Sequence, residues 1–365
     1  MTSRSGWMIY GAYGYTGVLV AEEAVRRGHR PILAGRSAEK LAPLAARLGL
    51  EALAVDLSDT PSLTRALERV QVVFHAAGPF VDTSDAMIRA CLEARTSYVD
   101  ITGEVAVFQN TFTYDAAARD AGIALVSGVG FDVVPTDCMA RYLAEKLPGA
   151  TELEIAIAGL AEVSAGTAKS MFDGMLIGGQ ARRDGKLVAT PTGRDLKRVR
   201  FADRERTTMA IPWGDLETAF HTTGIPNITT YVATPGNMAA LAHNTWRLQE
   251  LMAPVTRAVL GAGPIKRAIV GAIERRVSGP DEKARREGGS HVWCRVANAS
   301  GRSVEGWLET VNGYTFTALA GVRSVEKLLA ESAERPAGAL TPARAFGADF
   351  VLEIEGSRRY DTLPS

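Results

Sequence analysis

Short apolar runs alternate with segments of helical period over the first third of the chain. Six runs are short and apolar, at residues 7–10, 31–34, 53–55, 72–76, 98–100 and 123–126. Strands that are buried on both faces of a parallel sheet have this composition. Between the runs, apolar residues recur three or four positions apart, as at Leu41, Leu44 and Leu48, which is the period of a helix packed on a sheet. The alternation predicts βα units around a parallel sheet.

Residues that start and stop helices fall at the ends of these helical segments. Ser37 precedes one segment, and Thr60 followed by Pro61 precedes the next, where proline suits the first helical position. Gly28 and Gly122 stand where two other helices are expected to end. The local signals and the hydrophobic pattern therefore predict the same elements.

The pattern changes after residue 135. Longer strand-like runs follow at residues 153–157, 227–233, 292–296 and 303–310, and a helix is predicted over 314–330. The last two runs are separated by Asn298, Ala299, Ser300 and Gly301, which indicates a hairpin. We therefore predict an α/β protein in which a Rossmann-type parallel sheet over 1–133 is followed by a second, α+β domain over 134–334.

Composition supports a folded chain with more than one core. The chain has 365 residues, 46% of them hydrophobic, and roughly 150 residues per domain gives two domains. Basic and acidic residues each number 41, so no net charge draws the whole molecule toward nucleic acid. Three isolated cysteines and five scattered histidines, without CxxC or HExxH, indicate neither disulfides nor a metal site. Without a leader pattern at the start, we expect a cytoplasmic protein.

Apolar and basic residues are interleaved between Arg247 and Arg286. Leu251 and Val255, for example, stand close in sequence to Arg257. A basic amphipathic helix can bind a membrane or a partner. The alternative is a solvated basic face above a helix that packs on its own domain or across a dimer interface. We expect the latter, with a homodimer, and keep membrane association as the alternative.

The first predicted strand leads into a glycine turn and then a helix. A turn of this kind lets the backbone approach a diphosphate, while the amide hydrogens and positive end of the helix hold its charge. The spacing is GxxGxxG instead of the usual GxGxxG, so the position between strand and helix carries the prediction. The expected cofactor contacts in this turn are Gly11, Tyr13, Gly14, Tyr15, Thr16 and Gly17.

The end of the second predicted strand indicates which dinucleotide binds. Gly35, Arg36 and Ser37 follow this strand, and no acid is present there to accept from the 2′-hydroxyl of NAD. Arg36 is suited to pair with the 2′-phosphate of NADP, and Ser37 adds a hydroxyl; a solvated arginine at a helix start is the alternative. Asp56 follows the third strand and either contacts adenine or caps the next turn. NADPH is the expected cofactor.

Several motifs resemble those of a known family, the saccharopine dehydrogenase-like NAD(P) oxidoreductases. In the N-terminal third these are GAYGYTG at 11–17, AGRS at 34–37, AAGPF at 76–80, YVDITGE at 98–104 and GVGFDVVPTD at 128–137. Later motifs are similar to the branch called trans-acting enoyl reductases, which reduce a carbon–carbon double bond on acyl chains: IPWGD at 211–215, HTTGIPN at 221–227 and GADFV at 347–351. The resemblance implies that residues from about 335 to 365 return to the first domain.

Three of the matched motifs follow predicted strands at their carboxyl ends. Ligands of an open parallel sheet bind beyond these ends, where the strand order reverses. Further cofactor contacts are therefore expected from Ala77, Gly78, Pro79, Phe80, Thr102, Gly103 and Glu104. For Pro79 and Phe80, a role in shaping the loop is the alternative.

Hydride transfer needs little from the protein beyond orientation, a polarising group and a proton source. The candidates are Tyr98, Asp100, Glu104, Asp132, Asp137 and His221, of which we select Tyr98, Asp132 and His221 as catalytic. The alternative for Asp132 and Asp137 is to cap a helix that enters the second domain. For His221 the alternative is a hydrogen-bonded structural residue. His75, inside the fourth strand, is expected to lie in the core.

These observations predict an NADPH-dependent reductase that transfers hydride to an enoyl-type acceptor on a small-molecule or acyl substrate. Residues 166–178 and 218–233 are mostly uncharged, and no arginine cluster is evident for a substrate with several carboxylates. One alternative is reduction of a carbon–nitrogen double bond, as in saccharopine chemistry. The others are a non-catalytic NADPH-binding sensor and a lipid-associated protein.

Overall fold

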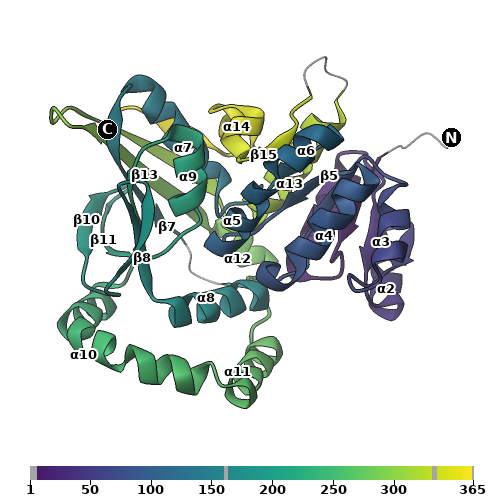
Figure 1. Cartoon of the computed structure of the whole chain (residues 1–365), viewed down its shortest axis with the longest axis horizontal. Coiled ribbons are helices and arrows are strands. Elements are labelled where there is room, and N and C mark those ends of the chain that lie inside the picture. The colour runs from purple at the N-terminus through teal and green to yellow at the C-terminus, as the bar shows by residue number, and fades with distance from the viewer. Residues whose placement is uncertain (1–5, 160–162, 331–334, 364–365) are drawn as a thin grey trace. The chain divides into compact units, whose positions relative to one another are not determined.

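The computed structural model describes residues 6–159, 163–330 and 335–363, which form two compact units (Figure 1). Unit 1 comprises Met1–Val134 and Gly313–Glu355, and unit 2 comprises Pro135–Asn312 and Gly356–Ser365. The sequence-based division placed 134–334 in the second domain and returned the chain to the first at about 335. The structure returns it at residue 313, because helix α13 (Gly313–Leu329) buries its apolar face in the core of unit 1. The last residues belong to unit 2.

Unit 1 is built on a parallel sheet, which has seven strands in the described residues. The strands are β1 (Trp7–Tyr10), β2 (Ile32–Gly35), β3 (Ala52–Ala54), β4 (Val72–His75), β5 (Ser97–Asp100), β6 (Ala124–Val126) and β15 (Gly338–Leu340). Their order is β15-β6-β5-β4-β1-β2-β3, so the direction of succession reverses between β1 and β4. Strands β1 to β6 lie within one residue of the predicted runs, and the predicted Rossmann-type sheet is confirmed.

Helices cover both faces of this sheet. They are α1 (Tyr15–Arg26), α2 (Ala38–Leu48), α3 (Thr60–Leu67), α4 (Phe80–Ala94), α5 (Val105–Thr113), α6 (Asp115–Ala121), α13 and α14 (Pro342–Phe346), with a 3-10 turn at Phe350–Glu353. One core cluster joins the sheet to α1, α2 and α13 through Val20, Leu41 and Val322. The other joins it to α3 and α4 through Leu63 and Met87. Strands β1, β4 and β6 are therefore buried on both faces, as the sequence predicted, whereas the edge strand β3 is exposed at Ala52 and Ala54.

The helix-capping residues of unit 1 are those predicted, except that the cap of α3 lies one residue earlier than expected. Ser37 caps α2, since its hydroxyl oxygen accepts from the backbone N–H of Lys40 at 3.3 Å. The cap of α3 is Asp59 and not Thr60, because the Asp59 carboxylate accepts from Ser62 N–H at 3.1 Å. Gly122 ends α6 with a φ of 70°, a left-handed conformation that suits glycine.

Unit 2 contains a mixed sheet, with nine strands in the described residues. The strands are β7 (Ala150–Ala158), β8 (Gly179–Arg183), β9 (Lys186–Thr190), β10 (Leu196–Arg200), β11 (Glu205–Ala210), β12 (Asn227–Ala233), β13 (Gly289–Asn298), β14 (Ser303–Val311) and β16 (Arg358–Tyr360). The predicted α+β domain is confirmed, and β13 and β14 form the predicted hairpin. The sequence did not indicate β8 to β11, because these strands are rich in Arg, Lys and Thr and lack a continuous apolar run.

The helices of unit 2 differ widely in burial. They are α7 (Val134–Lys146), α8 (Ala165–Ile177), α9 (Asp215–Thr223), α10 (Gly236–Leu260), α11 (Gly263–Arg276) and α12 (Glu282–Glu287). Helices α8, α10 and α11 contact one another at the lower edge of this unit in Figure 1. Among the described residues, no helix combines the length and apolar character needed to cross a membrane.

Candidate functional site

The glycine turn lies where the strand order of unit 1 reverses. Gly11 follows β1 with a φ of +85°, and a Cβ on it would stand 2.8 Å from the backbone carbon of Ala76, just after β4. A Cβ on Gly17 would overlap the carbonyl oxygen of Gly11, so only glycine allows α1 to start this close to the strand end. The turn therefore brings the start of α1 to the position at which ligands of such sheets bind.

The start of α1 fits the diphosphate of a dinucleotide. Gly14 is the N-cap residue, no side chain caps the helix, and its first turn contains no acid. Tyr13, Tyr15 and Thr16 are all partly exposed there. The amide hydrogens and the positive end of the helix dipole are thus directed at a region without competing carboxylates. An anion would be stabilised at this place.

The end of β2 presents a cation beside the same turn. Gly35 allows the Tyr13 ring to pack against its backbone, since a Cβ would lie 2.8 Å from Tyr13 Cε1. Arg36 follows directly and is exposed. Ser37, as the cap of α2, already accepts one hydrogen bond from Lys40 and keeps its hydroxyl proton as a donor. Arg36 and Ser37 thus place two hydrogen-bond donors at the end of β2.

Asp56 lies at the end of β3 and organises its own turn. Its carboxylate accepts from Ser58 N–H at 2.9 Å and from the Ser58 hydroxyl at 2.7 Å. These hydrogen bonds, with a smaller contribution from the Arg36 guanidinium, lower the pKa of Asp56. Of the two roles considered for Asp56, the turn-capping one is thus present in the structure, and an adenine contact stays a prediction.

Glu104 joins two neighbouring loops at the carboxyl end of the sheet. Its carboxylate accepts from Phe80 N–H at 3.3 Å and from Val81 N–H at 2.9 Å, at the start of α4. The preceding peptide bond, between Gly78 and Pro79, is cis. Glu104 therefore fixes the loop after β4, a capping contact across 23 residues that no local sequence signal indicates.

Asp100 is the centre of a buried hydrogen-bond network at the end of β5. Its carboxylate accepts from Tyr98 Oη at 2.7 Å, Ser127 Oγ at 3.0 Å, and the backbone N–H groups of Thr102 and Gly128 at 3.0 and 2.8 Å. Burial raises the pKa of Asp100 to about 6, against the effect of these four donors. The network joins the ends of β5 and β6 and so shapes the loops above them.

Tyr98 and Thr102 are held inside this network. Tyr98 is fully buried in the core, its hydroxyl donates to Asp100, and burial raises its pKa well above the ordinary value. This placement favours a structural role for Tyr98 over proton transfer to a substrate. Thr102 is likewise fully buried, and its Oγ1 accepts from Glu104 N–H at 3.1 Å. Its side chain shapes the loop, and contact with a cofactor stays a prediction.

Asp132 lies against the same loops and is partly exposed. A Cβ on Gly103 would stand 3.1 Å from Asp132 Oδ2, so the glycine permits this approach. Burial and the nearby Glu104 carboxylate raise the pKa of Asp132 to about 6. A carboxyl group with this pKa holds and releases a proton near neutrality more readily than an ordinary aspartate.

His75 lies in the core, as predicted. It is fully buried, its Nε2 lies 3.1 Å from Thr83 Oγ1, and burial lowers its pKa to about 3. Because the Thr83 hydroxyl donates to the Ala77 carbonyl at 2.7 Å, it accepts from His75, which is therefore neutral and protonated on Nε2. His75 supports the loop after β4.

In unit 2, His221 lies on α9 beside a buried ion pair. Its Nε2 is 3.8 Å from Glu217 Oε2, and the His221 side chain is 33% exposed. Arg182 pairs with Glu217 at 2.6 Å, with both side chains buried. Asp137, which is fully buried, accepts from Thr222 Oγ1 at 2.5 Å, so this candidate connects α7 to α9. His221 is accessible enough for a proton role, while Asp137 is structural.

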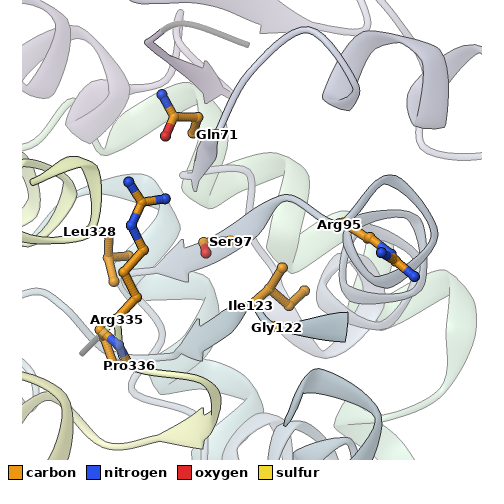
Figure 2. Close-up of a pocket in the computed structure, with 8 residues that line it drawn as sticks. All are labelled: Gln71, Arg95, Ser97, Gly122, Ile123, Leu328, Arg335 and Pro336. Carbon is orange, nitrogen blue, oxygen red and sulfur yellow. The ribbon is translucent and has the colours of Figure 1, made fainter. Parts of the chain in front are cut away.

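A cavity of about 290 Å³ lies at the opposite end of the unit 1 sheet (Figure 2). Its lining residues precede or begin strands, or end helices: Gln71, Arg95, Ser97, Gly122, Ile123, Leu328, Arg335 and Pro336. The glycine turn, Arg36 and Asp132 all follow strands at their carboxyl ends. The cavity is therefore separate from the site. No group of three or more His, Cys, Asp or Glu side chains suited to a metal is present in the described ranges.

Known sequences match part of the chain. The family described as saccharopine dehydrogenase NADP binding domain matches residues 7–126. A protein of Mycobacterium tuberculosis provisionally named a trans-acting enoyl reductase is 36% identical over 156 residues, which are 40% of this chain and 37% of that protein. A trans-acting enoyl reductase of Mycobacterium bovis is 35% identical over 138 residues, 36% of this chain and 33% of that one. The chain thus spans little more than a third of these relatives.

The fold of the whole chain also has a counterpart among solved structures. Apo saccharopine dehydrogenase (L-Glu forming) from Saccharomyces cerevisiae superposes with a TM-score of 0.60 over 97% of this chain and 99% of that one, at 12% identity. This likeness concerns the fold alone, whereas the family match covers the glycine turn, Arg36 and Asp100 by sequence. The resemblance expected from the motifs is confirmed. Residues 7–126 thus match the family described as saccharopine dehydrogenase NADP binding domain, and the fold of the chain is similar to that of saccharopine dehydrogenase.

Proposed function

We propose that this chain is an NADPH-dependent oxidoreductase that transfers hydride to the carbon–carbon double bond of an enoyl-type acceptor. The observation that carries the proposal is the uncapped start of α1 at the reversal of strand order, with the exposed Arg36 beside it. The names of the relatives, trans-acting enoyl reductases, support the acceptor class.

Arg36 supports NADPH over NADH. An arginine forms charge-assisted hydrogen bonds with a phosphate oxygen, worth about 1.5 to 3 kcal/mol each, or roughly ten- to a hundredfold in affinity. NADH lacks this phosphate and offers a 2′-hydroxyl, for which a carboxylate is the usual acceptor. The end of β2 provides none, and Asp56 at the end of β3 is engaged by Ser58.

The chain's own residues would orient the cofactor and handle the proton, while the reduced nicotinamide supplies the hydride when bound. The start of α1 and Arg36 would bind the phosphates. Glu104 and the Asp100 network hold the loops after β4 and β5, including Gly78, in one conformation. Asp132, with its pKa of about 6, is the best-placed proton carrier in unit 1, and His221 is the candidate in unit 2.

An apolar acceptor suits the residues expected near the substrate. Residues 218–233 contain no Asp, Glu, Lys or Arg. A substrate with several carboxylates would need paired arginines. In this part of unit 2 Arg182 is buried and already paired with Glu217.

The test is a comparison of acceptors under identical conditions. The purified chain is incubated with NADPH and either an enoyl thioester or an imine that bears carboxylates, and loss of the reduced-nicotinamide absorbance is followed. We expect turnover with the enoyl thioester, slower turnover with NADH, and loss of turnover in Asp132→Asn or His221→Gln, whichever carries the proton. Preference for the imine would overturn the acceptor class. NADPH binding without turnover on any acceptor would favour the sensor alternative.

A further inference from the structure

Three helices of unit 2 expose an unusual amount of apolar side chain. We call this region the helical apolar surface; it consists of the exposed large apolar residues of α8, α10 and α11. Its members are Met171, Met175, Ile177, Met238, Leu241, Leu248, Leu251, Met252, Val255, Val259 and Ile265, each at least 40% exposed. In the rest of the described chain only four large apolar side chains are exposed to a comparable extent. The three helices contact one another.

Helix α10 buries little of its surface within the described part of this chain. Only Ala239 of its 25 residues is buried. Most helical stability in proteins comes from packing of an apolar face, and an isolated helix is marginal in water. The face in question is well defined, since Met238, Leu241, Leu248 and Val255 recur at spacings of three, seven and seven residues. The described residues of this chain therefore leave this face uncovered.

The same segment carries an excess of positive charge. Residues 236–276 contain six basic and two acidic residues, a net charge of +4 in a chain whose total is zero. Arg247, Arg257, Arg267, Arg275 and Arg276 are all exposed, and none has an ion-pair partner among the described residues. Elsewhere in unit 2 most arginines pair with a carboxylate, as Arg206 pairs with Asp203. The surface thus combines apolar side chains with uncompensated guanidinium groups.

We propose that the helical apolar surface docks on a membrane that contains anionic lipids. Apolar side chains of α8, α10 and α11 would enter the acyl boundary, while the arginines of α10 and α11 contact the headgroups. Binding of this kind scales with buried apolar area plus attraction to anionic lipid. No helix in the described ranges spans a bilayer, so the contact is peripheral. The inference does not depend on the proposed reductase activity.

A second copy of the chain fits this surface less well. A dimer seam along α10 would bring two segments of charge +4 together, and the repulsion between them would oppose association. A seam between two helices would also leave Met171, Met175 and Ile177 on α8 in water. A lipid surface covers all three helices at once and supplies the missing negative charge.

The test is flotation of the full chain with vesicles. Phosphatidylcholine vesicles are compared with vesicles of phosphatidylcholine and phosphatidylserine, at low and high salt. We expect binding to the anionic vesicles only, weakened by salt. Arg267→Gln, Arg275→Gln and Arg276→Gln together should lower the affinity about a hundredfold, since each basic residue near the surface contributes about fivefold. The matched control, Arg65→Gln with Arg200→Gln and Arg302→Gln, should bind as the parent chain does.

The apolar contribution is tested with Leu248→Asn and Leu251→Asn, which are 60% and 75% exposed and should not disturb folding. The double variant should lose vesicle binding at unchanged thermal stability, and the control Leu352→Asn should keep it. Absence of binding to anionic vesicles would overturn the proposal. So would equal binding to neutral vesicles, or a dimer in light scattering that dissociates in the Leu248, Leu251 variant.

Discussion

Helices α13 and α10 are both amphipathic, but α13 is largely buried and α10 is largely exposed. Nine of the 17 residues of α13 are buried, and they pack against α1 and the sheet of unit 1. One of the 25 residues of α10 is buried. An apolar stripe therefore shows that a helix needs a covering surface, but the tertiary structure decides whether the chain itself provides it.

The end of β5 in unit 1 and helix α10 in unit 2 also differ in which groups are held in an unfavourable environment. At the end of β5 the group is a carboxyl group, because Asp100 is fully buried and burial raises its pKa to about 6. On α10 they are apolar groups in water, such as Leu251. Buried charge is characteristic of sites that handle protons, and exposed apolar surface of sites that bind partners.

The most direct test of the comparison places the same charge on both helices. Val322→Asp puts a carboxylate at a fully buried position of α13, and we expect the free energy of unfolding to fall by about 4 kcal/mol or more. Leu251→Asp puts it at an exposed position of α10, and we expect a change within about 0.5 kcal/mol. Urea denaturation measures both. A similar loss in the two variants would show that α10 is packed in solution.

A second test separates the proposed cofactor site at Arg36 from the helical apolar surface. Arg36→Asp should weaken NADPH binding ten- to a hundredfold and leave NADH binding unchanged or improved, because it replaces the phosphate partner with a carboxylate. Calorimetry with both cofactors measures this, with Arg65→Asp on α3 as the control. Vesicle binding should be unaffected, whereas an unchanged ratio of the two dissociation constants would remove Arg36 from the site.

A third test concerns the buried charge of unit 1. The pKa of Asp132 in the folded chain, about 6, lies above its ordinary value of 3.8, so the folded state holds this proton more tightly. The resulting stabilisation is present below pH 4 and is lost as the pH rises through 6. Asp132→Asn should therefore match the parent in acid and exceed its stability by about 3 kcal/mol above pH 6.

Thermal unfolding across this pH range measures the difference between Asp132→Asn and the parent. Asp120→Asn, which alters an exposed carboxylate on α6, serves as the control. Its difference in stability from the parent should not change with pH. If the stability difference between Asp132→Asn and the parent is also independent of pH, Asp132 is solvated in the folded chain.

The smallest expected effect is that of Tyr98→Phe. This substitution removes one of the four donors to Asp100 and keeps the ring in the core, so we expect a loss of about 1.5 kcal/mol in unfolding free energy. With a structural role for Tyr98, kcat and its pH profile should stay close to those of the parent. A large fall in kcat at unchanged stability would instead restore Tyr98 as a proton donor.

Parts of the site were predictable and parts were not. The glycine turn, Arg36 and the strand ends are local patterns, so their positions could be derived from spacing. The capping of α4 by Glu104 and the burial of Tyr98 beside Asp100 could not, because they depend on which strands become neighbours. The same holds for Arg182, which the fold of unit 2 brings to Glu217, whereas His221 and Glu217 lie four residues apart on α9.

The sequence alone determined the βα order, the parallel sheet and the position of the glycine turn, since each rests on the period or chemistry of residues close together in the chain; the preference for NADPH stays a prediction. Only the tertiary structure decided that α13 belongs to unit 1 and that α10 lies uncovered. The physical reason is that hydrophobic burial depends on contacts between distant segments, and a local pattern fixes which face must be buried without fixing what buries it.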